Sequence, residues 1–89
     1  MFNFFMKYRI TRLCGKSDYT VKFDGKIDSF IANKFLESLK DFEVKVKSSD
    51  SIWLQKGEKN IFMYFYGEIL FVNFSEEEVE TIVNMALRE

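Results

Sequence analysis

Apolar and polar residues change their spacing several times along the chain, and each spacing predicts one kind of element. The stretch 4–13 is a strand candidate in which Tyr8 and Ile10 alternate with polar residues, and the stretch 19–23 alternates at every second residue. With the turn-rich segment between them, these two stretches predict a first β-hairpin. From 27 to 40, apolar residues recur every three or four positions, as on one side of an amphipathic helix. Asp28 is the second residue of this run and is expected to be the N-cap of that helix.

Alternation returns after this helix and predicts two further strands. Residues 42–47 read as a half-buried strand, and a turn rich in serine leads to a short apolar strand at 52–54. When the strands are aligned by their connecting turns, Lys45 is expected opposite Trp53, and Trp53 opposite Phe62.

The most apolar stretch, 60–74, places aromatic and β-branched residues on both sides of Gly67. Glycine suits the first central position of a two-residue turn, so we predict a hairpin in which Tyr66 faces Ile69. Because side chains alternate along a strand, this pairing defines two faces. The face expected to be inner carries Ile61, Met63, Phe65, Leu70, Val72 and Phe74. The face expected to be outer carries Phe62, Tyr64, Tyr66, Ile69, Phe71 and Asn73.

The last element has the strongest local signature. Ser75 is expected to cap a second helix, with Glu78 as the reciprocal partner of a capping box and Phe74 and Val79 as a hydrophobic staple. The apolar stripe of this helix consists of Val79, Ile82, Val83, Ala86 and Leu87.

Together these elements predict a single α+β domain that spans residues 1–89 in two layers. An antiparallel sheet of five to six strands is expected, with two helices packed on one face, in the element order ββαββββα. This order is similar to the strand, helix, four strands, helix arrangement of TATA-binding-protein-like half-domains, with an extra strand at the front. The resemblance concerns the order of elements and implies nothing about function.

Composition narrows the classes of function. The net charge of −1, from 13 basic and 14 acidic residues, argues against general attraction to nucleic acid or to an anionic membrane. Cys14 is the only cysteine and histidine is absent, which excludes an intrachain disulfide and the zinc patterns that need these ligands. No stretch approaches the ~20 apolar residues of a membrane span. We expect a cytoplasmic protein with no membrane partner and no cofactor.

The sequence shows no catalytic motif. Gly15, Lys16 and Ser17 match the end of a phosphate-binding loop, but Ile10 stands where that pattern needs a glycine. Without histidine, acid–base chemistry would depend on carboxylates, lysines or tyrosines, and the acidic residues fall in predicted turns and on helix surfaces. The sequence therefore predicts a protein that is not an enzyme.

Function is expected on the outer face of the sheet, because its apolar patch is larger than a soluble monomer usually exposes. The candidate binding residues are Trp53, Phe62, Tyr64, Tyr66 and Phe71, with Ile69 beside them and Lys45 and Lys47 at the border. Three alternatives remain open for what covers this apolar patch. The N-terminal Phe2, Phe4 and Phe5 could fold across the patch, or a second copy could dock there as a homodimer. A small ligand or single-stranded nucleic acid, whose bases stack on aromatic rings, is the third alternative.

Acidic corners offer a different function, the weak binding of calcium or magnesium, since these cations take oxygen ligands. The candidate ligands are Asp24, Asp28, Glu76, Glu77 and Glu78. Helix capping is the ordinary explanation for such residues, and no EF-hand spacing is present.

Overall fold

The computed structural model describes residues 7–13 and 17–88. The strands are β1 (Tyr8–Arg12), β2 (Asp18–Phe23), β3 (Glu43–Lys47), β4 (Ser51–Lys56), β5 (Lys59–Tyr64) and β6 (Glu68–Val72). The helices are α1 (Ser29–Ser38) and α2 (Glu76–Leu87). The predictions made for Phe2, Phe4 and Phe5, for Cys14 and for most of the phosphate-loop-like segment fall on residues outside this description.

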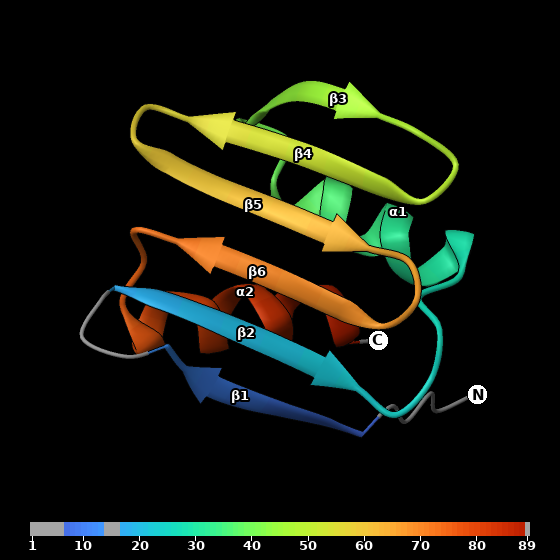
Figure 1. Cartoon of the computed structure of the whole chain (residues 1–89), viewed down its shortest axis with the longest axis horizontal. Helices are drawn as coiled ribbons and strands as arrows, with labels where there is room; N and C mark the ends of the chain where they lie inside the picture. Colours follow the sequence, from blue (N-terminus) through green and yellow to red (C-terminus); the bar gives the residue numbers. More distant parts are fainter. Residues whose placement is uncertain (1–6, 14–16, 89) are drawn as a thin grey trace.

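The strands form one antiparallel sheet in the order β1-β2-β6-β5-β4-β3. Both helices lie behind the sheet in Figure 1, so neither α1 nor α2 covers the face turned toward the viewer, which we call the helix-free face. Strands β3 to β6 form the predicted meander, and the first hairpin joins it by pairing β2 with β6. The two-layer α+β fold and the element order are confirmed.

Both helices begin at the N-caps that the sequence predicts. The Asp28 side chain accepts a hydrogen bond from the backbone N–H of Ile31 at 2.9 Å, which satisfies a donor left free in the first turn of α1. Ser75 and Glu78 form the complete capping box, in which each side chain accepts a hydrogen bond from the other residue's backbone N–H. These local contacts define where the two helices start.

The core fills the space between the helices and one face of the sheet. Its fully buried side chains come from both helices and the four central strands, and they are Val21, Ile31, Phe35, Ile52, Leu54, Ile61, Met63, Ile69, Phe71, Val79 and Val83. Full burial of a side chain of this size contributes about 1.5–3 kcal/mol. Edge strands β1 and β3 contribute no fully buried side chain, so they are the less firmly anchored parts of the sheet.

The hairpin between β5 and β6 differs from the prediction. Its closing pair is Tyr64 with Glu68 around a three-residue loop, not Tyr66 with Ile69 around a two-residue turn. Relative to the prediction, the pairing is shifted by three residues. Because this number is odd, every side chain of β6 points to the face opposite the expected one.

Because of this shift, the residues of β6 lie on the opposite faces of the sheet from those predicted, and this includes the candidate binding residue Phe71. Phe71 and Ile69, both predicted on the outer face, are core residues with 0% exposure. Leu70 and Val72, both predicted to be inner, lie on the helix-free face and are partly buried. Phe71 therefore packs under the helices and is not available for binding.

Tertiary contacts of the loop account for this register. Phe65 donates from its backbone N–H to the Asp50 carbonyl at 3.0 Å, and its own carbonyl accepts from the Ile27 N–H at 2.9 Å. Gly67 has φ +130°, and a Cβ there would lie 2.6 Å from the carbonyl oxygen of Gly25. Only glycine fits this position without a shift of the neighbouring backbone. The loop is thus held between segments that lie far from it in the sequence.

A β-bulge in β3 causes the second difference. The register shifts so that Val46, and not Lys45, pairs with Trp53. Lys45 becomes the extra residue of the bulge, and beyond it the two faces of the strand are exchanged. Lys47 pairs with Ile52, a core residue, so Lys47 belongs to the helix side of the sheet and does not border the outer face.

Candidate functional site

One row of side chains crosses the helix-free face from one edge of the sheet to the other. Strand pairing brings one residue of each strand into this row, and paired residues share a face. We name it the central row; it consists of Val46, Trp53, Phe62, Leu70, Thr20 and Thr11, from β3 to β1. The first four members are apolar, so an unbroken apolar strip runs across four neighbouring strands.

Trp53 is held in one position within this strip. Its ring stacks on Phe62, with the ring centroids 5.6 Å apart and the planes inclined by 15°. The indole Nε1–H donates to Asn60 Oδ1 at 2.8 Å, and Gln55 Nε2 donates to the same oxygen at 3.2 Å. Both rings remain partly exposed. An aromatic side chain already fixed in this way loses little conformational entropy when a partner covers it.

Two tyrosines extend the aromatic surface at one end of the face. Tyr64, on β5, stacks on Tyr66 with 5.8 Å between ring centroids. Tyr66 is displaced from its predicted strand position into the loop before β6, where it is 67% exposed. Its hydroxyl donates to Glu68 Oε1 at 2.7 Å, and this hydrogen bond raises the pKa of Tyr66 because the nearby carboxylate disfavours the phenolate.

Charges on the helix-free face are mixed in sign. The charged residues that strand pairing places on this face are Arg9, Lys22, Asp18, Glu43 and Glu68. Lys45, at the bulge, has its ammonium 3.9 Å from the Glu43 carboxylate. The basic border predicted from Lys45 and Lys47 is therefore not formed, since one lysine lies beside an acid and the other is on the helix side.

The acidic corners are used inside the fold. Asp28 caps α1, and Glu78 takes part in the capping box and in an ion pair with Lys59. Asp24, Glu76 and Glu77 do not come together with them. Within residues 7–13 and 17–88, no group of three or more His, Cys, Asp or Glu side chains is placed to hold a metal ion.

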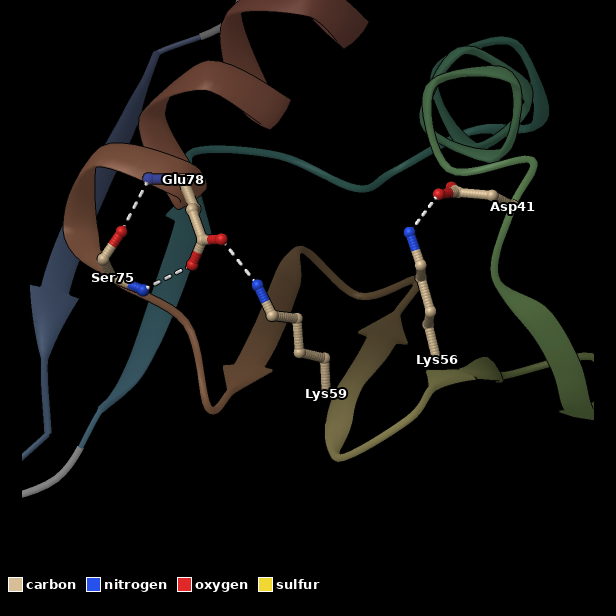
Figure 2. A network of polar contacts seen from close by, with 5 residues as sticks. All are labelled: Asp41, Lys56, Lys59, Ser75 and Glu78. Carbon is tan, nitrogen blue, oxygen red and sulfur yellow. Dashed lines mark hydrogen bonds and ion pairs between the residues drawn. The ribbon is translucent and has the colours of Figure 1, made fainter.

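A groove of about 1050 Å³ lies at the end of the sheet where α2 begins. Two ion pairs belong to its lining, Lys56 with Asp41 and Lys59 with Glu78, and Figure 2 shows both. The hydrogen bond from Lys56 lowers the pKa of Asp41, and the hydrogen bond from Lys59 lowers the pKa of Glu78. The ion pairs connect the turn between β4 and β5 to the start of α2 and to the segment that follows α1.

The same lysines also contact aromatic rings. The ammonium of Lys56 lies 5.9 Å from the Phe42 centroid, and that of Lys59 lies 5.0 Å from the Phe74 centroid. The lining of the groove holds four acidic and two basic residues, a net charge of −2. With both lysines engaged and the surroundings acidic, the groove is not suited to anions, and we assign its polar contacts to stability.

Comparisons of the chain with protein-family models, with curated proteins and with solved structures found no significant match. The resemblance to TATA-binding-protein-like half-domains thus remains a resemblance in element order. No helix in the described part of the chain is long and apolar enough to cross a membrane.

The structure places three of the predicted residues, Trp53, Phe62 and Tyr64, together on the helix-free face. Sequence reasoning missed Val46 and Leu70, which belong to the same face. Their positions depend on a bulge and on a loop register that alternation does not specify. Sequence reasoning also missed that the Asn60 amide accepts a hydrogen bond from Trp53, although the predicted pairing of β4 with β5 already makes Asn60 a diagonal neighbour of Trp53.

Proposed function

We propose that this protein acts by binding and not by catalysis, and that its helix-free sheet face binds a second copy of the chain. The observation that supports this is the central row, whose apolar members form a continuous strip with no helix over it. Such strips on a monomer commonly mark an interaction surface. Trp53 stands within the strip, and tryptophan is the residue type most enriched at interface hot spots.

A two-fold contact uses one face twice, so the face has to be complementary to itself. Lys22 and Asp18 lie on opposite sides of Thr20 along β2, at equal distance from it. A two-fold axis along the central row would bring Lys22 of one copy over Asp18 of the other. Charge pairs at the rim of an interface contribute mainly to orientation and specificity. The mixed charges of this face therefore suit a second copy.

The size of the face predicts a weak dimer. Six strands spaced by ~4.8 Å, with about five residues of ~3.3 Å each, define a surface of roughly 24 by 17 Å. This is about 400 Å² per copy, half of the ~800 Å² that each partner buries in an interface of standard size. We expect a dissociation constant in the micromolar range.

Balanced charge makes nucleic acid the weaker alternative. Binding of single strands combines aromatic stacking with a basic groove along the phosphates. Here Trp53 and Phe62 supply the rings, but Glu43, Glu68 and Asp18 lie on the same face as the basic residues. A phosphate backbone would meet as many negative as positive side chains.

The test is the molecular mass in solution across a concentration series, by sedimentation equilibrium from about 1 μM to 1 mM. We expect a reversible rise from monomer to dimer. Trp53→Ala should raise the dissociation constant at least tenfold while the monomer stays folded, since truncation at an interface centre costs about 2 kcal/mol or more. Tyr64→Ala, at one end of the face, should raise the dissociation constant by a smaller factor. Met85→Ala is the matched control, because Met85 is a 52% exposed apolar residue on α2.

Three results would contradict the proposal. The first is a monomer at every concentration. The second is a dimer that Met85→Ala weakens as much as Trp53→Ala does. The third is a salt-dependent change of Trp53 fluorescence on adding a single-stranded oligonucleotide, without any dependence on protein concentration, which would favour a nucleic-acid reader.

A further inference from the structure

The hairpin between β4 and β5 closes on two residues of the same charge. Lys56 pairs directly with Lys59 across a two-residue turn formed by Gly57 and Glu58. Residues opposite each other in an antiparallel pair have their Cβ atoms about 4.5–5.5 Å apart, so two like charges in these positions are destabilising. The two strands alone therefore do not account for the stability of this closing pair.

The compensating charges come from two other parts of the chain. Figure 2 shows Lys56 directed to Asp41, in the segment between α1 and β3. It also shows Lys59 directed to Glu78, in the first turn of α2. Two carboxylates that belong to neither strand thus neutralise the closing pair of the hairpin.

The pair next to the closing pair holds the Trp53 side chain. Gln55 pairs with Asn60 in the ladder, one position from the two lysines. Asn60 Oδ1 accepts the hydrogen bonds from Trp53 Nε1 and from Gln55 Nε2. Local opening begins where the fewest contacts hold a structure, and the end of a hairpin is such a place. If the closing pair opens, Asn60 is the next residue to be released, and the indole loses its acceptor.

We propose that Asp41 and Glu78 are positioning residues that act on Trp53 through the end of this hairpin. By neutralising the closing pair, the two carboxylates keep Asn60 in place and thereby keep the indole in one orientation on the helix-free face. An ordered side chain loses little conformational entropy when a partner covers it, so this orientation favours binding of a second copy. Only this last step rests on the proposed function, because the orientation of Trp53 is a property of the monomer.

The two lysines distinguish this role from general stabilisation. An ion pair that only stabilises the fold is lost whichever partner is replaced, and replacing the second partner does not restore it. Here the acids are needed because Lys56 and Lys59 oppose each other. Replacing both lysines by uncharged residues should therefore make Asp41 and Glu78 dispensable for the position of Trp53.

The experiment is an NMR measurement of solvent exchange at the Trp53 indole N–H, the only such group in the chain. A dilution series gives the exchange rate of the monomer. In the double variant Asp41→Asn, Glu78→Gln we expect this rate to rise about fivefold, because the closing pair is no longer neutralised. Glutamine keeps a side-chain acceptor for the capping box, so α2 should still begin at Ser75.

A rescue and a matched control complete the experiment. Adding Lys56→Met and Lys59→Met to the double variant should return the exchange rate to that of the parent. The control is Glu58→Gln, Glu77→Gln, which removes two negative charges from the lining of the same groove but leaves both ion pairs intact. This control should exchange as the parent does.

Three results would overturn the positioning role: an unchanged rate in Asp41→Asn, Glu78→Gln, an equal rise in the control, or no rescue by the methionines. Self-association gives a separate answer. The dissociation constant of the dimer should rise about fivefold in the double variant and return with the rescue. Faster indole exchange with an unchanged dissociation constant would overturn the link to binding. A parent chain that stays monomeric contradicts the proposed function, whereas the exchange rates still decide the positioning role.

Discussion

The two faces of the sheet are built from the same strands and are both apolar at their centre, but they are used in different ways. On the helix side, mostly aliphatic residues such as Leu54 and Ile61 have at most 1% exposure, because the helices cover them. On the other side, Trp53 and Phe62 stay partly exposed and are ordered by stacking and by a side-chain hydrogen bond. Apolar content alone therefore does not identify the core. The core is the face that the helices cover.

Strand β6 shows this difference within adjacent residues. Phe71 contacts Phe74 edge to face at 5.2 Å inside the core, while Leu70 continues the central row on the free face. A truncation at each position measures how much of the stability comes from each side.

The largest effect is expected from Phe71→Ala, which should cost about 3–5 kcal/mol of unfolding free energy, since it leaves a cavity under the helices. Leu70→Ala should cost about 1 kcal/mol, because the side chain is partly exposed and can be replaced by water. The measurement is the free energy of unfolding of both variants, determined by urea denaturation. Equal losses would mean that the two faces are not distinguished as described.

The Gly67→Val variant tests the loop that sets this arrangement. Strain at φ +130°, together with the close approach of the Gly25 carbonyl, should destabilise the protein by well over ~1 kcal/mol. Gly25→Ala is the matched control, since no atom lies within 4 Å of its added Cβ. If both variants unfold at the same urea concentration, the loop does not hold the register of β6.

Ser75→Ala probes the helix that covers the core side. Loss of the side-chain acceptor for the Glu78 N–H should cost about 1 kcal/mol. Ser29→Ala, at the exposed start of α1, should stay within about 0.5 kcal/mol of the parent. Self-association at low temperature should be the same in both variants, because neither touches the free face. The measurement is the midpoint of urea denaturation. If this midpoint is the same for Ser75→Ala as for the parent, the capping box is contradicted.

The smallest effect concerns pH and the ion pairs of Figure 2. The folded-state pKa values of Asp41 and Glu78 lie below their ordinary values of 3.8 and 4.5, so the ion pairs stabilise the fold above those values. This stabilisation should be lost as the pH falls through the lowered pKa values. Both pairs are exposed, so the change is small. Thermal melts should show a smaller acid-induced decrease in Tm in the double variant Lys56→Met, Lys59→Met than in the parent.

Some features of this protein follow from short-range sequence signals. The order of elements, the N-caps Asp28 and Ser75 and the pairing of Trp53 with Phe62 were all predicted correctly. The two caps depend on residues three positions apart, and the Trp53–Phe62 pair depends on one hairpin whose paired residues are nine positions apart. Of the aromatic candidate site residues, Trp53, Phe62 and Tyr64 could be predicted for the same reason, whereas the burial of Phe71 could not.

The face on which β6 presents each side chain was decided by the tertiary structure. Both alternating sets of residues in this strand are apolar, so burial of either set would satisfy the pattern, and a shift by an odd number of residues exchanges them. The choice depends on contacts of the loop with Ile27, Asp50 and Gly25, which come from other parts of the chain. The alternation of apolar and polar residues does not predict the bulge at Lys45 either. The tertiary structure therefore determined that Phe71 belongs to the core and that Leu70 and Val46 belong to the helix-free face.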